Sequence, residues 1–159
     1  MRGIYNIGNI KKTKKQEKKH ISQMSEAEKA YLKNKIKAIN TEDITVSQHI
    51  LNKKKDIEFE MENIFEVLNE DDIENLIVEY NETPTNGLID RRVLLRGDKS
   101  YNVRFKSGKG SFISPANICF VISLNTYMII TVYWNKSNDS HKTINWNRYN
   151  EDLDIIKAS

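Results

Sequence analysis

The segment that decides the fold is ICFVISLNTYMIITVYW, at residues 118–134. It consists of two apolar runs, Ile118–Leu124 and Tyr127–Trp134, which are separated by the polar pair Asn125–Thr126. Both runs are rich in β-branched and aromatic residues, and each has the length of a strand rather than of a helix. We therefore predict a hairpin of two strands at the centre of the hydrophobic core.

The residues that precede this hairpin predict further strands. Residues 88–96 alternate in polarity so that Arg92 and Arg96 lie on one face of a strand. A weaker strand is predicted over residues 101–105. The glycine-containing residues 106–116 are predicted to form a loop, because they lack a sustained apolar pattern and a full phosphate-loop spacing.

Helices are expected ahead of the strands. Ser25 and Glu28 have the spacing of a capping box, which predicts a helix that runs to about residue 39. A short helix is expected after Ser47. A third helix is expected at residues 60–68, where apolar residues recur at three- and four-residue spacing.

These elements predict an α+β fold in which N-terminal helices are followed by a mainly antiparallel sheet of four to five strands. Residues 76–80 are interpreted as a helix end or, preferably, as the first strand. Residues 153–156 are interpreted as a last short strand or helix. The chain divides into a basic, partly disordered or helical extension at 1–40 and an α+β domain at 41–159. His20 lies in this extension, and we expect it to be inert.

Charge is strongly segregated along the chain. Residues 1–40 carry eleven Lys or Arg against three Glu, residues 41–82 carry three Lys against thirteen acids, and residues 83–159 carry eleven Lys or Arg against six acids. Basic segments at both ends favour a polyanionic partner such as RNA, although charge runs are also common on solvated faces.

Several classes of protein are excluded by what the sequence lacks. The single cysteine, Cys119, excludes an internal disulfide framework, and we interpret it as a small buried hydrophobic residue. No metal, thiol-protease, serine-hydrolase or nucleotide-loop motif is present, so we expect no cofactor and no metal. No segment has the about 18 apolar residues of a membrane-spanning helix, and no secretory signal is visible. We expect a cytoplasmic protein with no membrane partner.

The remaining polar residues can support cleavage of RNA without a metal ion. RNA supplies its own nucleophile, the 2′-hydroxyl, so the protein needs only a base, an acid and cations for the phosphate charge. Histidine suits the acid and base roles, and the planar guanidinium of arginine binds two phosphate oxygens at once. The candidates are His141 and His49 as acid and base in an undecided order, Arg92 and Arg96 on the phosphate, Thr143 to position it, and Tyr149.

Each candidate also has a purely structural interpretation. His141 lies in a polar segment and is equally well explained as an exposed loop histidine. His49 has apolar neighbours and is equally well explained as a packed or capping residue. Arg92 and Arg96 are also explained as the outward decoration of a strand. These alternatives stay open at the level of the sequence.

With these residues, the segment 44–159 resembles the superfamily of small ribonuclease toxins that groups barnase, EndoU, the tRNA-cleaving colicins and RelE. The resemblance rests on helices ahead of an antiparallel sheet, a histidine on an early helix, two basic residues on a strand, and a histidine or hydroxyl near the last strands: His49, Arg92, Arg96, His141 and Thr143. It implies metal-independent cleavage of RNA, often tRNA, that ends in a 2′,3′-cyclic phosphate. It also implies a cognate immunity or antitoxin protein, as for a toxin–antitoxin or prophage protein.

Two functions of other classes compete with this interpretation. The chain is alternatively a non-catalytic nucleic-acid-binding or regulatory protein, in which residues 1–40 carry the affinity and binding falls steeply with salt. It is alternatively a protein-interaction module that uses the acidic residues 56–82 to engage a basic partner.

Overall fold

The computed structural model describes residues 17–53, 58–139 and 144–157, apart from the side chain of Lys53. Its strands are β1 (Lys18–His20), β2 (Thr45–Val46), β3 (Ile77–Thr85), β4 (Leu88–Arg96), β5 (Tyr101–Ser107), β6 (Gly110–Ser123) and β7 (Met128–Lys136). Its helices are α2 (Glu26–Lys37), α3 (Gln48–Lys53) and α4 (Met61–Leu68). Short 3₁₀ turns occupy Ile21–Gln23, Thr41–Asp43, Ile73–Leu76 and Trp146–Arg148.

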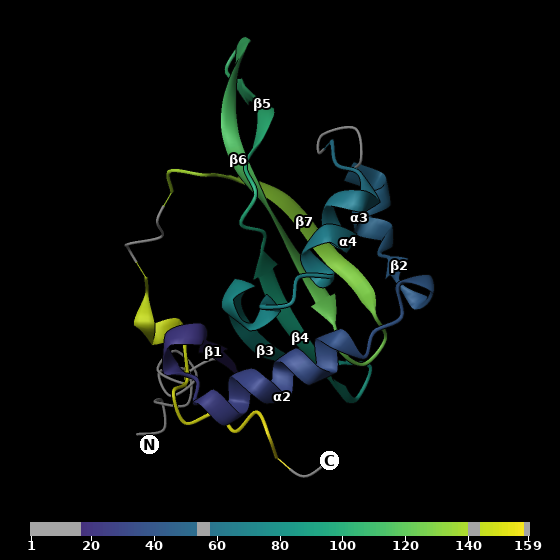
Figure 1. Ribbon diagram of the computed structural model, residues 1–159, viewed down its shortest axis with the longest axis vertical. Helices are drawn as coiled ribbons and strands as arrows, with labels where there is room; N and C mark the ends of the chain where they lie inside the picture. Colours follow the sequence, from purple (N-terminus) through teal and green to yellow (C-terminus); the bar gives the residue numbers. More distant parts are fainter. Residues whose placement is uncertain (1–16, 54–57, 140–143, 158–159) are drawn as a thin grey trace, which may run out of the picture.

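The seven strands of this described part form one sheet in the order β1-β3-β4-β6-β7-β2, and β5 pairs with β6 outside this path (Figure 1). The predicted α+β class is confirmed. The predicted strand count was too low, and the sheet is mixed because β2 pairs with β7 in parallel. The expected order of helices before strands is also wrong, because β1 precedes α2 and β2 lies between α2 and α3. Strands of three and two residues are too short to leave a periodic pattern in the sequence.

The central hairpin predicted from the sequence is confirmed as β6 and β7. The two strands pair from Ala116 opposite Lys136 to Ile122 opposite Ile129. The predicted capping box is also present at the start of α2. The Glu28 amide donates to Ser25 Oγ over 3.1 Å, and the Ser25 amide donates to Glu28 Oε1 over 3.0 Å. Each of these bonds satisfies a donor that the helix itself leaves without a partner.

The loop predicted at residues 106–116 is wrong, because most of it belongs to β6. The chain reverses tightly around Gly108, whose φ is +57°, and β5 pairs with β6 from Ser107 opposite Gly110 to Tyr101 opposite Ala116. β4 pairs with the same edge of β6, nearer to the C-terminal end of β6. β4 and β5 therefore run in the same direction along this edge, and the chain between them begins at Gly97. In Figure 1 the resulting β5–β6 hairpin projects beyond the rest of the sheet.

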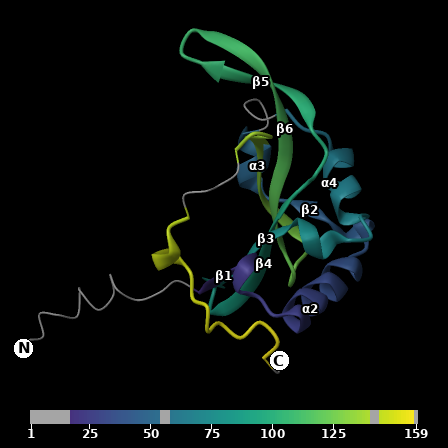
Figure 2. The ribbon, with the colours of Figure 1, turned by 60° about the vertical axis from the view of Figure 1, so that its left-hand side comes forward.

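Helices α2 and α4 cover one face of the sheet. Figure 2 shows them on one side of the strands and the turn Trp146–Arg148 on the other. The core between helices and sheet includes fully buried apolar side chains from both layers: Leu32, Ile36, Ile64, Ile73, Val93, Leu95, Ile118, Phe120 and Ile122. Helix α2, which belongs to the expected extension, therefore contributes to the same core as the sheet.

A buried ion pair joins β1, α2 and the C-terminal segment. Lys19 Nζ lies 3.0 Å from each carboxylate oxygen of Glu28 and donates a further bond of 3.0 Å to the carbonyl oxygen of Leu153. The Ile155 amide donates to the same carboxylate over 3.3 Å. Both charged side chains are at most a tenth exposed. Burial favours a higher pKa for Glu28, but the bonds from the Ser25 amide, from Lys19 and from the Ile155 amide outweigh it and lower the pKa.

Arg91 forms a second anchor for the C-terminal segment. Its guanidinium donates to the hydroxyl of Tyr80 over 2.9 Å, to the hydroxyl of Tyr31 over 3.2 Å and to the carbonyl oxygen of Ile155 over 2.7 Å. Tyr80 in turn donates to Glu82 over 2.7 Å. Arg91 therefore satisfies polar groups of α2, β3 and residue 155 inside the protein, and its side chain is not available to a ligand on the opposite face of the sheet.

We predict that Lys19→Met destabilises the protein by about 3 kcal/mol, because it leaves the Glu28 carboxylate buried without its cation. Denaturant unfolding followed by circular dichroism measures this loss. Lys29→Met is the matched control, since Lys29 pairs with the exposed Glu26 on the same helix and its loss should change stability little. An unchanged midpoint for Lys19→Met would contradict the structural role of the pair.

The stability should also depend on pH through Glu28. Because the pKa of Glu28 is lower in the folded protein than its ordinary value of 4.5, its stabilising contribution is present above pH 4.5 and is lost as the pH falls through the folded-state pKa. Unfolding midpoints measured between neutral pH and the acid range should therefore fall in the wild type. The fall should be smaller in Glu28→Gln, which has no carboxylate to protonate.

Candidate functional site on the outer face of the sheet

The face of the sheet opposite the helices carries two of the predicted site residues, Arg92 and Arg96, and Tyr149 contacts it. In β4, Val93 and Leu95 point into the core, so Arg92 and Arg96 point to the other side, as the alternation predicted. The strand register extends this set across the neighbouring strands. We call this surface the outer face; its members are Lys18, His20, Glu79, Asn81, Arg92, Leu94, Arg96, Cys119, Val121, Ser123, Thr131 and Tyr133.

Glu79 is the centre of a compact cluster on this face. Tyr149, which follows the turn Trp146–Arg148, donates its hydroxyl to Glu79 Oε1 over 2.6 Å. Lys18 Nζ lies 3.2 Å from Glu79 Oε2 and 5.0 Å from the centre of the Tyr149 ring. Partial burial and the hydrogen bond to Glu79 raise the pKa of Tyr149 above its ordinary value, so the phenol stays protonated as a donor.

His20 lies at the edge of the same cluster. Its ring contacts Trp146 and Tyr149 edge-on, with centroid distances of 5.4 and 5.5 Å. The Ser22 amide donates to His20 Nδ1 over 3.2 Å, and Ser22 Oγ lies 2.8 Å from the same nitrogen. Because Nδ1 accepts the Ser22 amide, the proton of the neutral ring is on Nε2.

A depression of about 290 Å³ adjoins the cluster and shares Lys18 with it. Asn81, Arg92, Val121 and Thr131 also line the depression. Arg92 Nε lies 2.6 Å from Asp90 Oδ2, and this carboxylate also accepts the Ser123 hydroxyl over 2.6 Å. The Asp90 contact holds Arg92 at the wall of the depression, with about a fifth of its side chain exposed.

Arg96 lies on the outer face but is engaged with the backbone. Its guanidinium donates to the carbonyl oxygens of Asp139 and Lys136, over 3.0 and 3.2 Å, and to Asn117 Oδ1 over 3.0 Å. These bonds fix the chain as it leaves β7. The geometry therefore gives Arg96 an anchoring role, and its predicted contact with a phosphate stays a prediction.

The other predicted site residues are separated from this cluster or lie outside the described residues. His49 is exposed on α3, which contacts β7 at the end of the sheet opposite to β1. In the described residues no hydrogen bond, ion pair or ring contact joins His49 to Arg92, Arg96 or Tyr149. His141 and Thr143 fall in residues 140–143, outside the described residues. The roles predicted for these three residues stay predictions.

The sequence did not indicate three functional candidates: Lys18, His20 and Glu79. His20 was expected to be inert in a disordered tail, but β1 pairs it with Glu79, 59 positions further along the chain. The only local signal was the i, i+2 spacing of Lys18 and His20, which puts both on one face of a strand. This spacing indicates a shared face only if residues 18–20 form a strand. A strand of three residues forms because it pairs with β3, which is distant in the sequence.

Cys119 lies on the outer face and is buried, which confirms the prediction of a buried residue. Burial raises the pKa of its thiol to about 11, although Arg96 and Tyr133 act in the opposite direction. The pKa of Tyr133 is also raised, first by burial and then by Cys119. Neither group is poised to act as a nucleophile near neutral pH.

Searches of protein-family models, of curated proteins and of solved structures return no match. Within residues 17–53, 58–139 and 144–157, no three histidine, cysteine or carboxylate side chains are grouped so that they could hold a metal ion. None of the helices found there is long and apolar enough to cross a membrane.

We predict that Cys119 in the native protein does not react with an aromatic disulfide reagent at pH 8. With a pKa of about 11 for the thiol, roughly one molecule in a thousand carries the thiolate at that pH, and the sulfur is buried. Absorbance of the released thiol measures the reaction, and denaturant should expose one reactive thiol per chain. Rapid labelling without denaturant would contradict the burial.

Proposed function

We propose that the protein is a metal-independent endoribonuclease of the small ribonuclease toxin type, with its active site on the outer face around Glu79. The observation that carries the proposal is the cluster of Lys18, His20, Glu79 and Tyr149, in which the ammonium and the phenol contact the carboxylate and the imidazole contacts the phenol ring. It supplies the acid, base and cationic groups that cleavage through the 2′-hydroxyl needs.

In the proposed reaction the 2′-oxygen of RNA attacks the adjacent phosphorus and the bond from phosphorus to the 5′-oxygen breaks. Glu79 takes the proton of the 2′-hydroxyl, and the imidazolium of His20 gives a proton to the leaving 5′-oxygen. Lys18 offsets the charge that develops on the phosphate. Tyr149 holds the Glu79 carboxylate in place. The products are a 2′,3′-cyclic phosphate and a free 5′-hydroxyl.

The depression beside the cluster supports an RNA substrate. Its lining combines the cations Lys18 and Arg92, the neutral hydrogen-bonding groups of Asn81 and Thr131, and the carboxylates Glu17 and Glu82. In the proposal the phosphate lies at Lys18 and Arg92. The acidic helix α4 is in the layer on the other side of the sheet, so its carboxylates do not face this substrate. A tRNA substrate in the cytoplasm and a cognate immunity or antitoxin protein belong to the same proposal.

We predict that the purified protein cleaves total tRNA in the presence of EDTA, and that Glu79→Gln and His20→Asn each lower the rate at least a hundredfold. Glutamine keeps the hydrogen bonds of Glu79 but is not a base, and asparagine keeps the capping bond to Ser22 but does not titrate. Denaturing gel electrophoresis measures cleavage, and end analysis identifies the cyclic phosphate.

Glu66→Gln is the matched control for Glu79→Gln. Glu66 likewise accepts a tyrosine hydroxyl, that of Tyr101 over 2.6 Å, and contacts a lysine, Lys99 over 3.1 Å, but it lies on α4. Its substitution should leave cleavage unchanged. Intact tRNA at high protein concentration would refute the enzymatic proposal, and cleavage that survives Glu79→Gln and His20→Asn would refute this assignment of the site. In that case His141→Ala and His49→Ala test the original prediction.

A further inference from the structure

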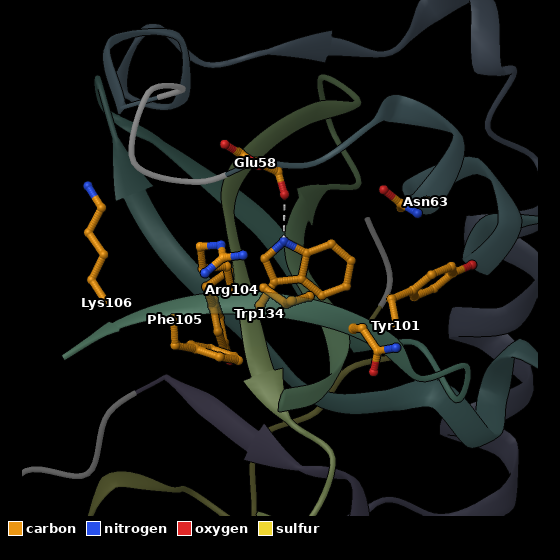
Figure 3. A pocket seen from close by; sticks show the side chains of 10 residues that line it. Glu58, Asn63, Tyr101, Arg104, Phe105, Lys106 and Trp134 are labelled. Carbon is orange, nitrogen blue, oxygen red and sulfur yellow. Dashed lines mark hydrogen bonds between the residues drawn. The ribbon is translucent and has the colours of Figure 1, made fainter. Parts of the chain in front are cut away.

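A second concave site lies at the base of the β5–β6 hairpin, which projects past α4 (Figure 1). It is a groove of about 550 Å³ beside residue 58 and the start of α4 (Figure 3). Its lining residues are Glu58, Asn63, Tyr101, Asn102, Val103, Arg104, Phe105, Lys106, Tyr133 and Trp134.

The groove presents aromatic rings in fixed orientations. Trp134 and Tyr101 contact each other with centroids 5.9 Å apart and an interplanar angle of 66°. The indole Nε1–H of Trp134 donates to the carbonyl oxygen of Glu58 over 2.7 Å, which holds the ring in the position drawn in Figure 3. Phe105 stacks on Phe112 of the opposite strand, with centroids 5.6 Å apart. Phe112 is 38% exposed although it is a large apolar residue.

The strands that line the groove are basic, and the carboxylate of Glu58 is the acidic group among its lining residues. Residues 99–138 contain five Lys or Arg and no Asp or Glu. Arg104 and Lys106 line the groove, and in the described part of the chain neither of them forms an ion pair. Lys136 Nζ lies 4.7 Å from the centre of the Phe112 ring. The nearby acid Glu66 is already paired with Lys99 and Tyr101, so its charge is offset.

We propose that this groove binds single-stranded RNA. Unpaired bases stack on the rings of Trp134 and Phe105, and Arg104 and Lys106 contact the phosphates. Aromatic rings interleaved with unpaired cations are the combination that recognises single strands, because every base has a face that can stack and every linkage has a charge. Asn63 and Glu58 lie at the rim, where an amide and a carboxylate can bond to the polar edge of a base. The inference is separate from the cleavage site on the outer face and does not require cleavage.

The test uses the full chain and a fluorescent, fully 2′-O-methylated RNA of about twelve nucleotides, within the usual range for such grooves. Methylation blocks the 2′-oxygen, so binding is measured whether or not the protein is a nuclease. Arg104→Gln with Lys106→Gln should weaken binding at least tenfold and reduce the slope of log affinity against log salt by about 1.4, which is about 0.7 for each lost phosphate contact.

The matched control removes the same two charges from α2, as Lys29→Gln with Lys35→Gln, and should change affinity less than twofold. Equal losses in the two double variants would show general electrostatic attraction and would overturn the groove. Phe105→Leu should weaken binding about fivefold if a base stacks there. Circular dichroism and the unfolding midpoint show whether each variant is folded.

Three further ligands and one spectroscopic signal test which chemical features of the RNA the groove recognises. An abasic strand of the same length and a duplex of the same sequence should each bind at least fivefold more weakly than the single strand. Equal affinity of either one, or of a polyglutamate peptide, would overturn a site for unpaired bases. In Trp146→Phe, where Trp134 is the only tryptophan, the single strand should quench the fluorescence. Unchanged Trp134 emission on saturation would place the RNA elsewhere.

Discussion

The buried ion pair between Lys19 and Glu28 holds together three segments that are distant in the sequence. Lys19 belongs to β1, Glu28 belongs to α2, and the pair also bonds to the backbone at Leu153 and Ile155. Two buried charges are tolerable only when each is neutralised and its remaining hydrogen-bonding capacity is filled. The two neighbours of Lys19, Lys18 and His20, point to the outer face because Lys19 points inward. The position of the proposed catalytic groups therefore depends on this pair.

Side chains alternate between the two faces of the sheet along each strand, so that one face packs against the helices and the other carries the polar groups of the proposed site. Val93 and Leu95 complete the core against α2 and α4, so Arg92 and Arg96 must point to the outer face. A register slip of one residue would bury the arginines and expose the core, which makes the register strongly determined. The outer face is in turn covered at its β1 end by the segment that carries Tyr149, and Arg91 anchors the end of that segment from the core side.

A difference in length between the two layers produces the second site. β6 has fourteen residues, whereas α4 has eight, and the strand continues as a hairpin where the helix layer has ended. The exposed part of such a hairpin needs stabilisation from its own side chains. Stacking of Phe105 on Phe112 and the contact of Lys136 with both rings provide it. The same rings, with the cations Arg104 and Lys106, give the hairpin a surface suited to unpaired nucleic acid, separate from the proposed cleavage site.

Elements with local signals could be predicted from the sequence. The apolar runs of β6 and β7, the capping box at Ser25 and the alternation that pairs Arg92 with Arg96 all follow from contacts within a few residues, and all three are present. Tertiary structure alone decided the rest. β1 and β2 exist only through distant partners, and the residues predicted as a loop at 106–116 became a strand because β5 supplies the hydrogen bonds. The pairing of His20 with Glu79 is also non-local, since a side chain acquires chemical neighbours only when the register of separate strands is set.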